Sequence, residues 1–136
     1  MVQIDVTYAG KLKCTAVHEP SGTTLVTAAP KDNMGDGSSF SPTDLVATAL
    51  AACMITTMGI AAAKHEIDLE GTTVRVQKFM STAPPRRIAK LPVEITVTKF
   101  VSPEFRQRLE AAAHTCPVHR TLSTETEMPI TFHWKD

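Results

Sequence analysis

Two cysteines are the residues of this 136-residue chain whose type and setting could do chemistry. Cys53 lies inside a long apolar stretch, and Cys116 is followed directly by Pro117. Two such thiols could form a peroxidatic and resolving pair, in which one is oxidised to a sulfenic acid and the other closes a disulfide with it. Alternatively, both are small buried apolar residues, which is a common role for free cysteine.

A cysteine nucleophile must be ionised, and the sequence limits what could ionise Cys53. This residue falls nine to twelve positions after the predicted start of its helix. The helix dipole fades beyond the first turn, so it cannot be the main source of activation. A positive side chain must approach instead, and Lys11, Lys13, Arg86 and Arg87 are candidates because they fall on predicted strands or loops.

A second constellation consists of His114, Cys116 and His119, whose nitrogen and sulfur atoms are of the kind that bind zinc. A structural zinc site needs four ligands, however, and Pro117 breaks the helix between them. We therefore expect no metal site. The chain also lacks a glycine-rich phosphate loop and a Ser-His-Asp arrangement, and we expect no cofactor.

Composition narrows the class of protein. The 14 Lys and Arg residues balance 14 Asp and Glu residues, and no basic block is present, which argues against partners such as nucleic acid or an anionic membrane. The length predicts one domain over residues 1–136. Three cysteines, the third being Cys14, are too few for a secreted disulfide framework, and no secretory signal is visible, so we expect a cytoplasmic protein.

Residues 45–63 form an uncharged run of nineteen, close to the length of a membrane span. Seven are alanine, and threonines and a glycine interrupt the rest, so we favour a helix that is apolar on every side and surrounded by protein.

The remaining pattern predicts an α+β fold without a run of βαβ crossovers. Ser41, Pro42 and Asp44 are typical of a capped helix start, and the helix should end near residue 65 or 66. A second capped helix opens at Ser102, and its buried stripe ends at Cys116. Before the first helix we expect a meander of three strands over 2–8, 11–18 and 23–28, with a turn at residues 9–10, and then an exposed loop over 30–40. Between the two helices we expect strands over 72–80 and 92–100. After the second helix we expect a short segment following Pro117 and a last strand over 129–134.

Three motifs in this framework resemble the family of osmotically induced protein C and the organic hydroperoxide resistance proteins (OsmC/Ohr). They are SPTDL at 41–45, AACM at 51–54 and HTCP at 114–117. The resemblance spans nearly the whole chain. It implies an intertwined α+β homodimer whose central helices pack together inside, which would explain a helix without a polar face.

The resemblance also implies a thiol peroxidase of the stress response. Cys53 would be the peroxidatic thiol that attacks a small organic hydroperoxide, and Cys116 would resolve the sulfenic acid as a disulfide. A dithiol reductant, such as a lipoylated protein, would then reduce the disulfide. Cys14 matches no family position.

The chain departs from the family pattern at two places. Thr43, followed by Asp44, stands where the hydroperoxide enzymes carry Glu, and Lys11 and Lys13 are the basic residues nearest to the family's hairpin Arg. Arg and Lys are not interchangeable where a forked donor is needed. An alternative function is therefore a non-enzymatic family member that binds a small hydrophobic ligand in the interface cleft.

Helix geometry adds one prediction. Thr43 and Asp44 precede Cys53 by ten and nine residues, or roughly 14 to 15 Å along one helix. Neither can touch the Cys53 of its own chain. If Thr43 or Asp44 assists the thiol, it must reach the Cys53 of the other subunit, so we expect an active site shared across the dimer interface. Lys11 and Lys13 are the other candidates for activating the thiol.

Overall fold

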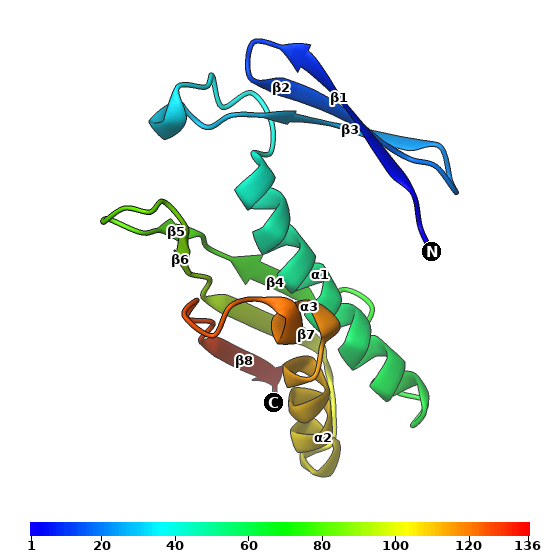
Figure 1. Cartoon of the computed structure of the whole chain (residues 1–136). Helices are drawn as coiled ribbons and strands as arrows, with labels where there is room; N and C mark the ends of the chain where they lie inside the picture. Colours follow the sequence, from blue (N-terminus) through cyan, green and yellow to red (C-terminus); the bar gives the residue numbers. More distant parts are fainter. The chain divides into compact units, whose positions relative to one another are not determined.

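The computed structural model describes all 136 residues. Contacts divide the chain into two compact units, Met1–Val46 and Ala47–Asp136. The long helix α1 (Pro42–Ala63) begins in the first unit and continues through the second (Figure 1). Strands, a long helix, further strands and further helices follow one another in the α+β order that the sequence predicted.

The first unit contains the predicted antiparallel meander. It consists of β1 (Ile4–Gly10), β2 (Lys13–His18) and β3 (Thr23–Ala28), paired in that order. The turn predicted at residues 9–10 lies further along the chain, because a bulge after Tyr8 keeps Gly10 paired with Lys13. Lys11 and Leu12 make the turn with φ of 55° and 61°, the left-handed backbone that suits the twist of a tight hairpin.

The loop after β3 is exposed, as expected, and it contains the short 3-10 helix η1 (Lys31–Asn33), which was not predicted. Gly35 is required in this loop. A Cβ atom at Gly35 would lie 1.8 Å from the carbonyl oxygen of Ala29, so no other residue fits. Asp36, the next residue, forms an ion pair with Lys13 of β2 at 3.0 Å, which fastens the loop to the sheet.

The predicted start of α1 is confirmed by a reciprocal capping box. The backbone N–H of Asp44 donates to Ser41 Oγ at 3.1 Å, and the backbone N–H of Ser41 donates to the Asp44 carboxylate at 2.8 Å. The helix ends at Ala63, two or three residues before the predicted end, and the chain turns at Glu66 with φ of 56°.

Helix α1 buries only one of its faces within this chain. Leu50, Met54, Met58 and Ala62 are buried, whereas Ile60 on the opposite face is 60% exposed. The expectation of a helix enclosed on every side is therefore not met by a single chain. By length and composition α1 could also cross a membrane, a test that the core helix of a soluble protein passes as well.

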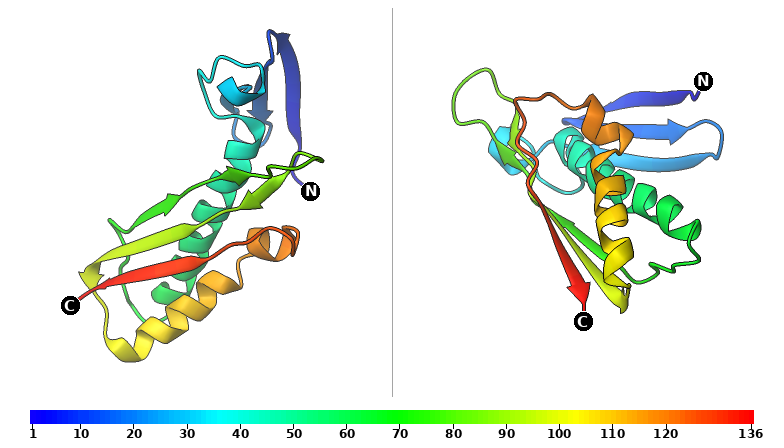
Figure 2. Two further views of the ribbon diagram at one scale, coloured as in Figure 1. Left: turned by 90° about the vertical axis from the view of Figure 1, so that its left-hand side faces the viewer. Right: turned by 90° about the horizontal axis from the view of Figure 1, so that it is seen from below.

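The main sheet of the second unit is built from β4 (Thr73–Val76), β7 (Val93–Phe100) and β8 (Ile130–Lys135), with β7 in the centre. Along β7, Val93, Ile95 and Val97 are buried and alternate with exposed polar residues, as predicted. They join one core with residues of α1 and α2 (Pro103–His114). Figure 2 shows both helices on the same face of this sheet.

One prediction about these strands is wrong. The strand expected over 72–80 is split into β4 and β5 (Phe79–Met80), because the chain leaves β7 after Gln77 and pairs with β6 (Ile88–Lys90). A single βαβ crossover is present, and it does not form part of a run, in agreement with the prediction. Strands β7 and β8 are parallel, and α2 and α3 (Pro117–Thr121) connect them. The buried side chains of Leu109 and Ala113 hold α2 in the core of this crossover.

The second helix starts where it was predicted, but without the predicted side-chain cap. Pro103 occupies its first turn, and the side chain of Ser102 makes no capping hydrogen bond to a backbone N–H of α2. The stripe of Leu109, Ala113 and Cys116 is fully buried, as expected.

Candidate active site

The structure brings Cys53 and Cys116 together. Cys53 lies in the middle of α1, and Cys116 lies between the end of α2 and the start of α3. The two side chains lie close enough for Cys53 to affect the ionisation of Cys116, and both cysteines are free rather than disulfide-bonded. Cys116 is 0% exposed and Cys53 is half-buried, so Cys53 is the more accessible sulfur.

The surroundings of Cys116 affect its ionisation in opposite directions. Burial raises the pKa of the Cys116 thiol, and the neighbouring Cys53 raises it further. The backbone N–H of His119 donates to Cys116 Sγ at 3.2 Å, which favours the thiolate and lowers the pKa in part. Pro117 at the first position of α3 places Cys116 at the N-cap, where a side chain can accept this bond.

Cys53 opens onto a cavity of about 580 Å³ on the exposed side of α1. The lining carries no charged side chain and is mostly apolar. It is formed by Ala52, Cys53, Thr56, Thr57, Ile60, Thr115 and Pro117. Sequence reasoning did not single out the threonines or Ile60, although positions three, four and seven residues after Cys53 share its helix face and could have been found in that way.

Two hydroxyl groups of this cavity already donate their hydrogens to the backbone. Thr57 Oγ1 donates to the carbonyl oxygen of Cys53, and Thr115 Oγ1 donates to the carbonyl oxygen of Ala112, both at 2.8 Å. A hydroxyl has one hydrogen and two acceptor lone pairs. Toward a molecule in the cavity, these two groups therefore act as hydrogen-bond acceptors.

The four residues expected to activate the thiol, Lys11, Lys13, Thr43 and Asp44, belong to the first unit. Lys13 forms the ion pair with Asp36, and Asp44 completes the capping box. Thr43 Oγ1 lies 3.2 Å from Ser41 Oγ. Their assignment as activating groups stays a prediction.

The ion pair with Lys13 also affects the ionisation of Asp36. Hydrogen bonds from Ser38 and then from Lys13 lower its pKa from 3.8 to about 2. Its partner Lys13 thus contacts the loop of the first unit.

Three other residues that the sequence suggested, Arg87, His114 and His119, do not line the cavity beside Cys53. Arg87 Nη1 donates to the carbonyl oxygens of Ile88 and Glu125, both at 3.3 Å. The rings of His114 and His119 are 6.3 Å apart, edge to face. No three His, Cys, Asp or Glu side chains converge in a geometry that could hold a metal ion.

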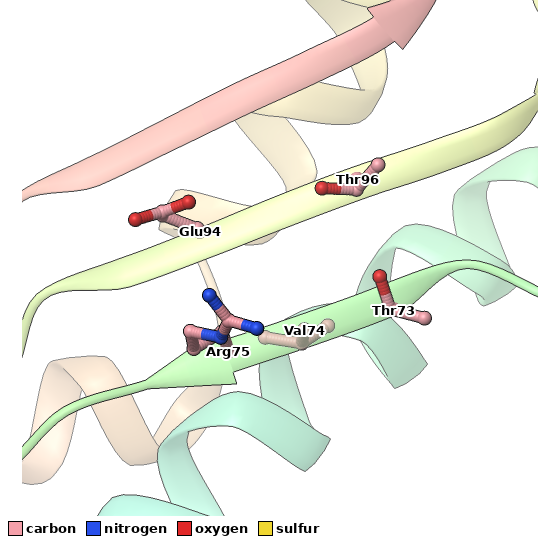
Figure 3. A pocket seen from close by; sticks show the side chains of 5 residues that line it. All are labelled: Thr73, Val74, Arg75, Glu94 and Thr96. Carbon is pink, nitrogen blue, oxygen red and sulfur yellow. The ribbon is translucent and has the colours of Figure 1, made fainter.

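A second hollow of about 340 Å³ lies on the main sheet (Figure 3). Thr73 and Arg75 of β4 and Glu94 and Thr96 of β7 project along it, and all four side chains are exposed. It contains no cysteine or histidine. This surface has the composition of a solvated sheet face and carries no nucleophile.

Comparisons with known proteins agree with this fold. The OsmC-like protein family matches residues 35–131. A Psychrobacter arcticus 273-4 protein named for osmotic stress induction and a detoxification response is 39% identical, with a TM-score of 0.92 over 98% of this chain and 96% of that one.

Two organic hydroperoxide resistance proteins share the fold at lower identity. One, from Legionella pneumophila, is 18% identical, with a TM-score of 0.77 over 98% of this chain and 96% of that one. The other, from Elizabethkingia anophelis, is 17% identical, with a TM-score of 0.78 over 99% of this chain and 96% of that one. Among curated proteins there is no match. With the family motifs, the fold and the extent of the match in agreement, this chain belongs to the OsmC-like family.

Proposed function

We propose that this protein is a thiol-dependent peroxidase that reduces organic hydroperoxides with Cys53 and Cys116. The observation that carries the proposal is the contact between the two thiols beside an uncharged cavity. Sulfenic acid formed on one sulfur can be resolved only by a thiol that lies within reach of it. The names of the Legionella and Elizabethkingia proteins add support for the substrate class.

The accessible Cys53 takes the first step. Its thiolate attacks the terminal oxygen of the hydroperoxide, the O–O bond breaks, and the alkoxide takes up the proton that the thiol released. Cys53 is now a sulfenic acid and the alcohol leaves. Cys116 attacks the Cys53 sulfur, water departs, and the disulfide forms. A dithiol then donates two electrons and two protons, which restores both thiols and leaves the dithiol as its own disulfide.

We further propose that the enzyme is a cytoplasmic homodimer whose active site is shared between subunits. The cavity lies on the face of α1 that its own chain leaves exposed, so a second copy packed there would enclose it. Lys11, Lys13, Thr43 or Asp44 of one subunit would then assist Cys53 of the other. A reducing compartment keeps both thiols available between turnovers.

Dithiol-dependent consumption of cumene hydroperoxide tests the activity. The wild-type protein should turn over, and Cys53→Ser should abolish the reaction. Cys116→Ser should stop after one equivalent of peroxide, because the sulfenic acid cannot close a disulfide. Cys14→Ser is the matched control and should retain full activity. Absence of turnover by wild-type protein with every dithiol tried would rule the proposal out.

A second candidate function is the binding of a small hydrophobic ligand without catalysis. The apolar cavity favours it. So do Thr43, at the position where the hydroperoxide enzymes carry Glu, and the lack of an Arg in the first hairpin, where Lys11 and Lys13 are the nearest basic residues. The rate of Cys53 alkylation against pH separates the two functions. Alkylation that is half-maximal well below ~8.5, the ordinary value for a free thiol, supports the peroxidase, and a midpoint at or above it supports the binding protein.

A further inference from the structure

From the pocket beside α3 we infer a second binding site, which takes small molecules that join one carboxylate to an apolar body. This Arg120 pocket has a volume of about 420 Å³ and follows α3 and the segment after it (orange in Figure 1). It is lined by His119, Arg120, Leu122, Thr124, Thr126 and Met128. The pocket shares no lining residue with the cavity beside Cys53, so the site is independent of the proposed peroxidase function.

Arg120 supplies the charge that binds the carboxylate. The guanidinium of Arg120 makes no hydrogen bond or ion pair within the chain, and no carboxylate lines the pocket. Arg87, by comparison, donates to the carbonyl oxygens of Ile88 and Glu125. The forked donors of a guanidinium match the two oxygens of a carboxylate, and such charge-assisted pairs are stronger than neutral hydrogen bonds. A guanidinium without a partner, beside a pocket without a carboxylate, therefore favours an anionic ligand.

The backbone that carries Arg120 is held in place by α3. The backbone N–H of Arg120 donates to the carbonyl oxygen of Cys116, and the backbone N–H of Leu122 donates to the carbonyl oxygen of Val118, both at 3.1 Å. The cationic rim and the start of the apolar floor thus belong to one ordered helix. A ligand that binds to such a segment does not have to order it first.

Leu122 and Met128 give the pocket its apolar floor. Both side chains are half-buried and pack against the core of the second unit. Thr126 Oγ1 donates to the carbonyl oxygen of Ile88 at 3.0 Å, which fixes the segment between them. An alkyl or aryl group that covers Leu122 and Met128 gains free energy by leaving water. The ligand that suits both the rim and the floor is an amphipathic carboxylate.

The site has to be tested on the protein as it assembles. The second copy is expected on the face of α1 that carries Ile60 and the cavity beside Cys53, and none of those residues lines the Arg120 pocket. A carboxylate of the second copy that paired with Arg120 would exclude the ligand. Binding is therefore measured on the full-length protein in solution.

An NMR titration of the reduced, ¹⁵N-labelled protein tests the site at pH 8, where an ordinary histidine is neutral. The probes are 4-phenylbutyrate, its uncharged amide, and acetate, which lacks the apolar body. The backbone amide signals of Arg120, Leu122 and Met128 should shift with 4-phenylbutyrate. Its Kd at this site should be at least about tenfold lower than that of the amide, as expected for a hydrogen bond to a charged group. Acetate, which cannot cover the floor, should also bind at least about tenfold more weakly.

Substitutions assign the preference to the guanidinium. In Arg120→Gln the acid and the amide should bind with similar Kd, because only the apolar floor remains. Arg120→Lys keeps the charge without the fork and should retain part of the preference. Arg108→Gln removes an exposed arginine of α2 that does not line the pocket, so it is the matched control and should leave both Kd values unchanged.

Three results would overturn the inference. They are equal Kd values for the acid and the amide in the wild-type protein, a preference for the acid that survives in Arg120→Gln, and signal shifts confined to residues around Cys53. None of these measurements needs turnover, so their failure leaves the proposed peroxidase function standing, and a protein without peroxidase activity would still be expected to bind the acid.

Discussion

The two cysteines differ in what the fold does to each of them. Cys53 faces a cavity, whereas Cys116 is fully buried and accepts a hydrogen bond from the His119 backbone. Since burial raises the pKa of the Cys116 thiol, this residue is held as a neutral thiol at neutral pH. The resolving step, which needs the Cys116 thiolate, is then the pH-dependent step of the proposed cycle.

This asymmetry predicts the pH dependence of disulfide closure. Below the raised pKa of Cys116, each pH unit increases its thiolate fraction about tenfold, so the rate constant for closing the disulfide should rise nearly tenfold per unit from about pH 7 to about 8.5. Rapid quenching with a sulfenic acid reagent, followed by mass spectrometry, measures it. Oxidation of Cys53 in the Cys116→Ser variant serves as the control for the first step. A flat closure rate over this range would contradict the prediction.

Lys13 and Lys11 lie two positions apart, and only Lys13 is among the groups that shift the pKa of Asp36. The hydrogen bond from Lys13 helps to lower the pKa of Asp36 to about 2, so Lys13→Met should raise that pKa part of the way to 3.8. Because the folded-state pKa is depressed, the stability that Asp36 contributes is present above pH 3.8 and is lost as the pH falls through about 2. Titration of the Asp36 carboxyl carbon by NMR measures the change.

Lys11→Met provides the matched control for this titration, because Lys11 is not among the groups that shift Asp36. An unchanged Asp36 titration in Lys13→Met would show that the ion pair does not persist in solution.

At the scale of the elements, the two helix starts look alike in sequence and differ in structure. Both read Ser-Pro with an acidic residue one or two positions later. At α1 the serine and the aspartate exchange hydrogen bonds, whereas the side chain of Ser102 makes no hydrogen bond to a backbone N–H of α2. The motif therefore predicts where a helix begins better than it predicts how the helix is capped.

This difference predicts unequal effects of two similar substitutions. Ser41→Ala should lower the free energy of unfolding by about 1 kcal/mol, the usual cost of losing an N-cap acceptor. Ser102→Ala should change it by no more than a few tenths of a kcal/mol, because no capping bond is lost. Urea unfolding monitored by the fluorescence of Trp134 measures both. Similar losses in the two variants would contradict the capping difference.

At the scale of the whole molecule, apolar surface is left exposed in both units. The side chains of Ile4, Val6 and Tyr8 on β1 are each more than half exposed, and so is Ile60 on α1. A soluble protein seldom leaves such surface in contact with water, and a second subunit would bury it. The exposed face of α1 thus supports the homodimer that the family resemblance implies.

The homodimer predicts a mass near twice the 14.7 kDa of one chain in sedimentation equilibrium. Ile60→Asp should shift the protein toward monomer, because it places a charge on the face of α1 that is expected to be enclosed. Phe100→Asp is the matched control, since Phe100 is similarly exposed, at 63% against 60%, but lies at the end of β7. Wild-type protein that sediments as a monomer would contradict the prediction.

The features that could be predicted from the sequence alone are local ones. The capping box of Ser41 and Asp44 needs only residues three positions apart, and the alternation along Val93, Ile95 and Val97 is set by the period of a strand. Both were predicted for that reason. The buried stripe that ends at Cys116 follows the helical period in the same way. The arrangement of the fold and the pairing of Cys53 with Cys116 were predicted from the resemblance to the family instead.

Which distant segments of the chain meet is known only from the folded structure. The pairing of β5 with β6, and of β8 alongside β7 in parallel, depends on where the chain returns after long connections, which no local pattern encodes. The contact between Cys53 and Cys116 likewise needs α1 and the end of α2 in one core. The acceptor character of Thr57 and Thr115 became visible only with the direction of each hydroxyl, since a sequence specifies a hydroxyl but not the carbonyl to which it donates.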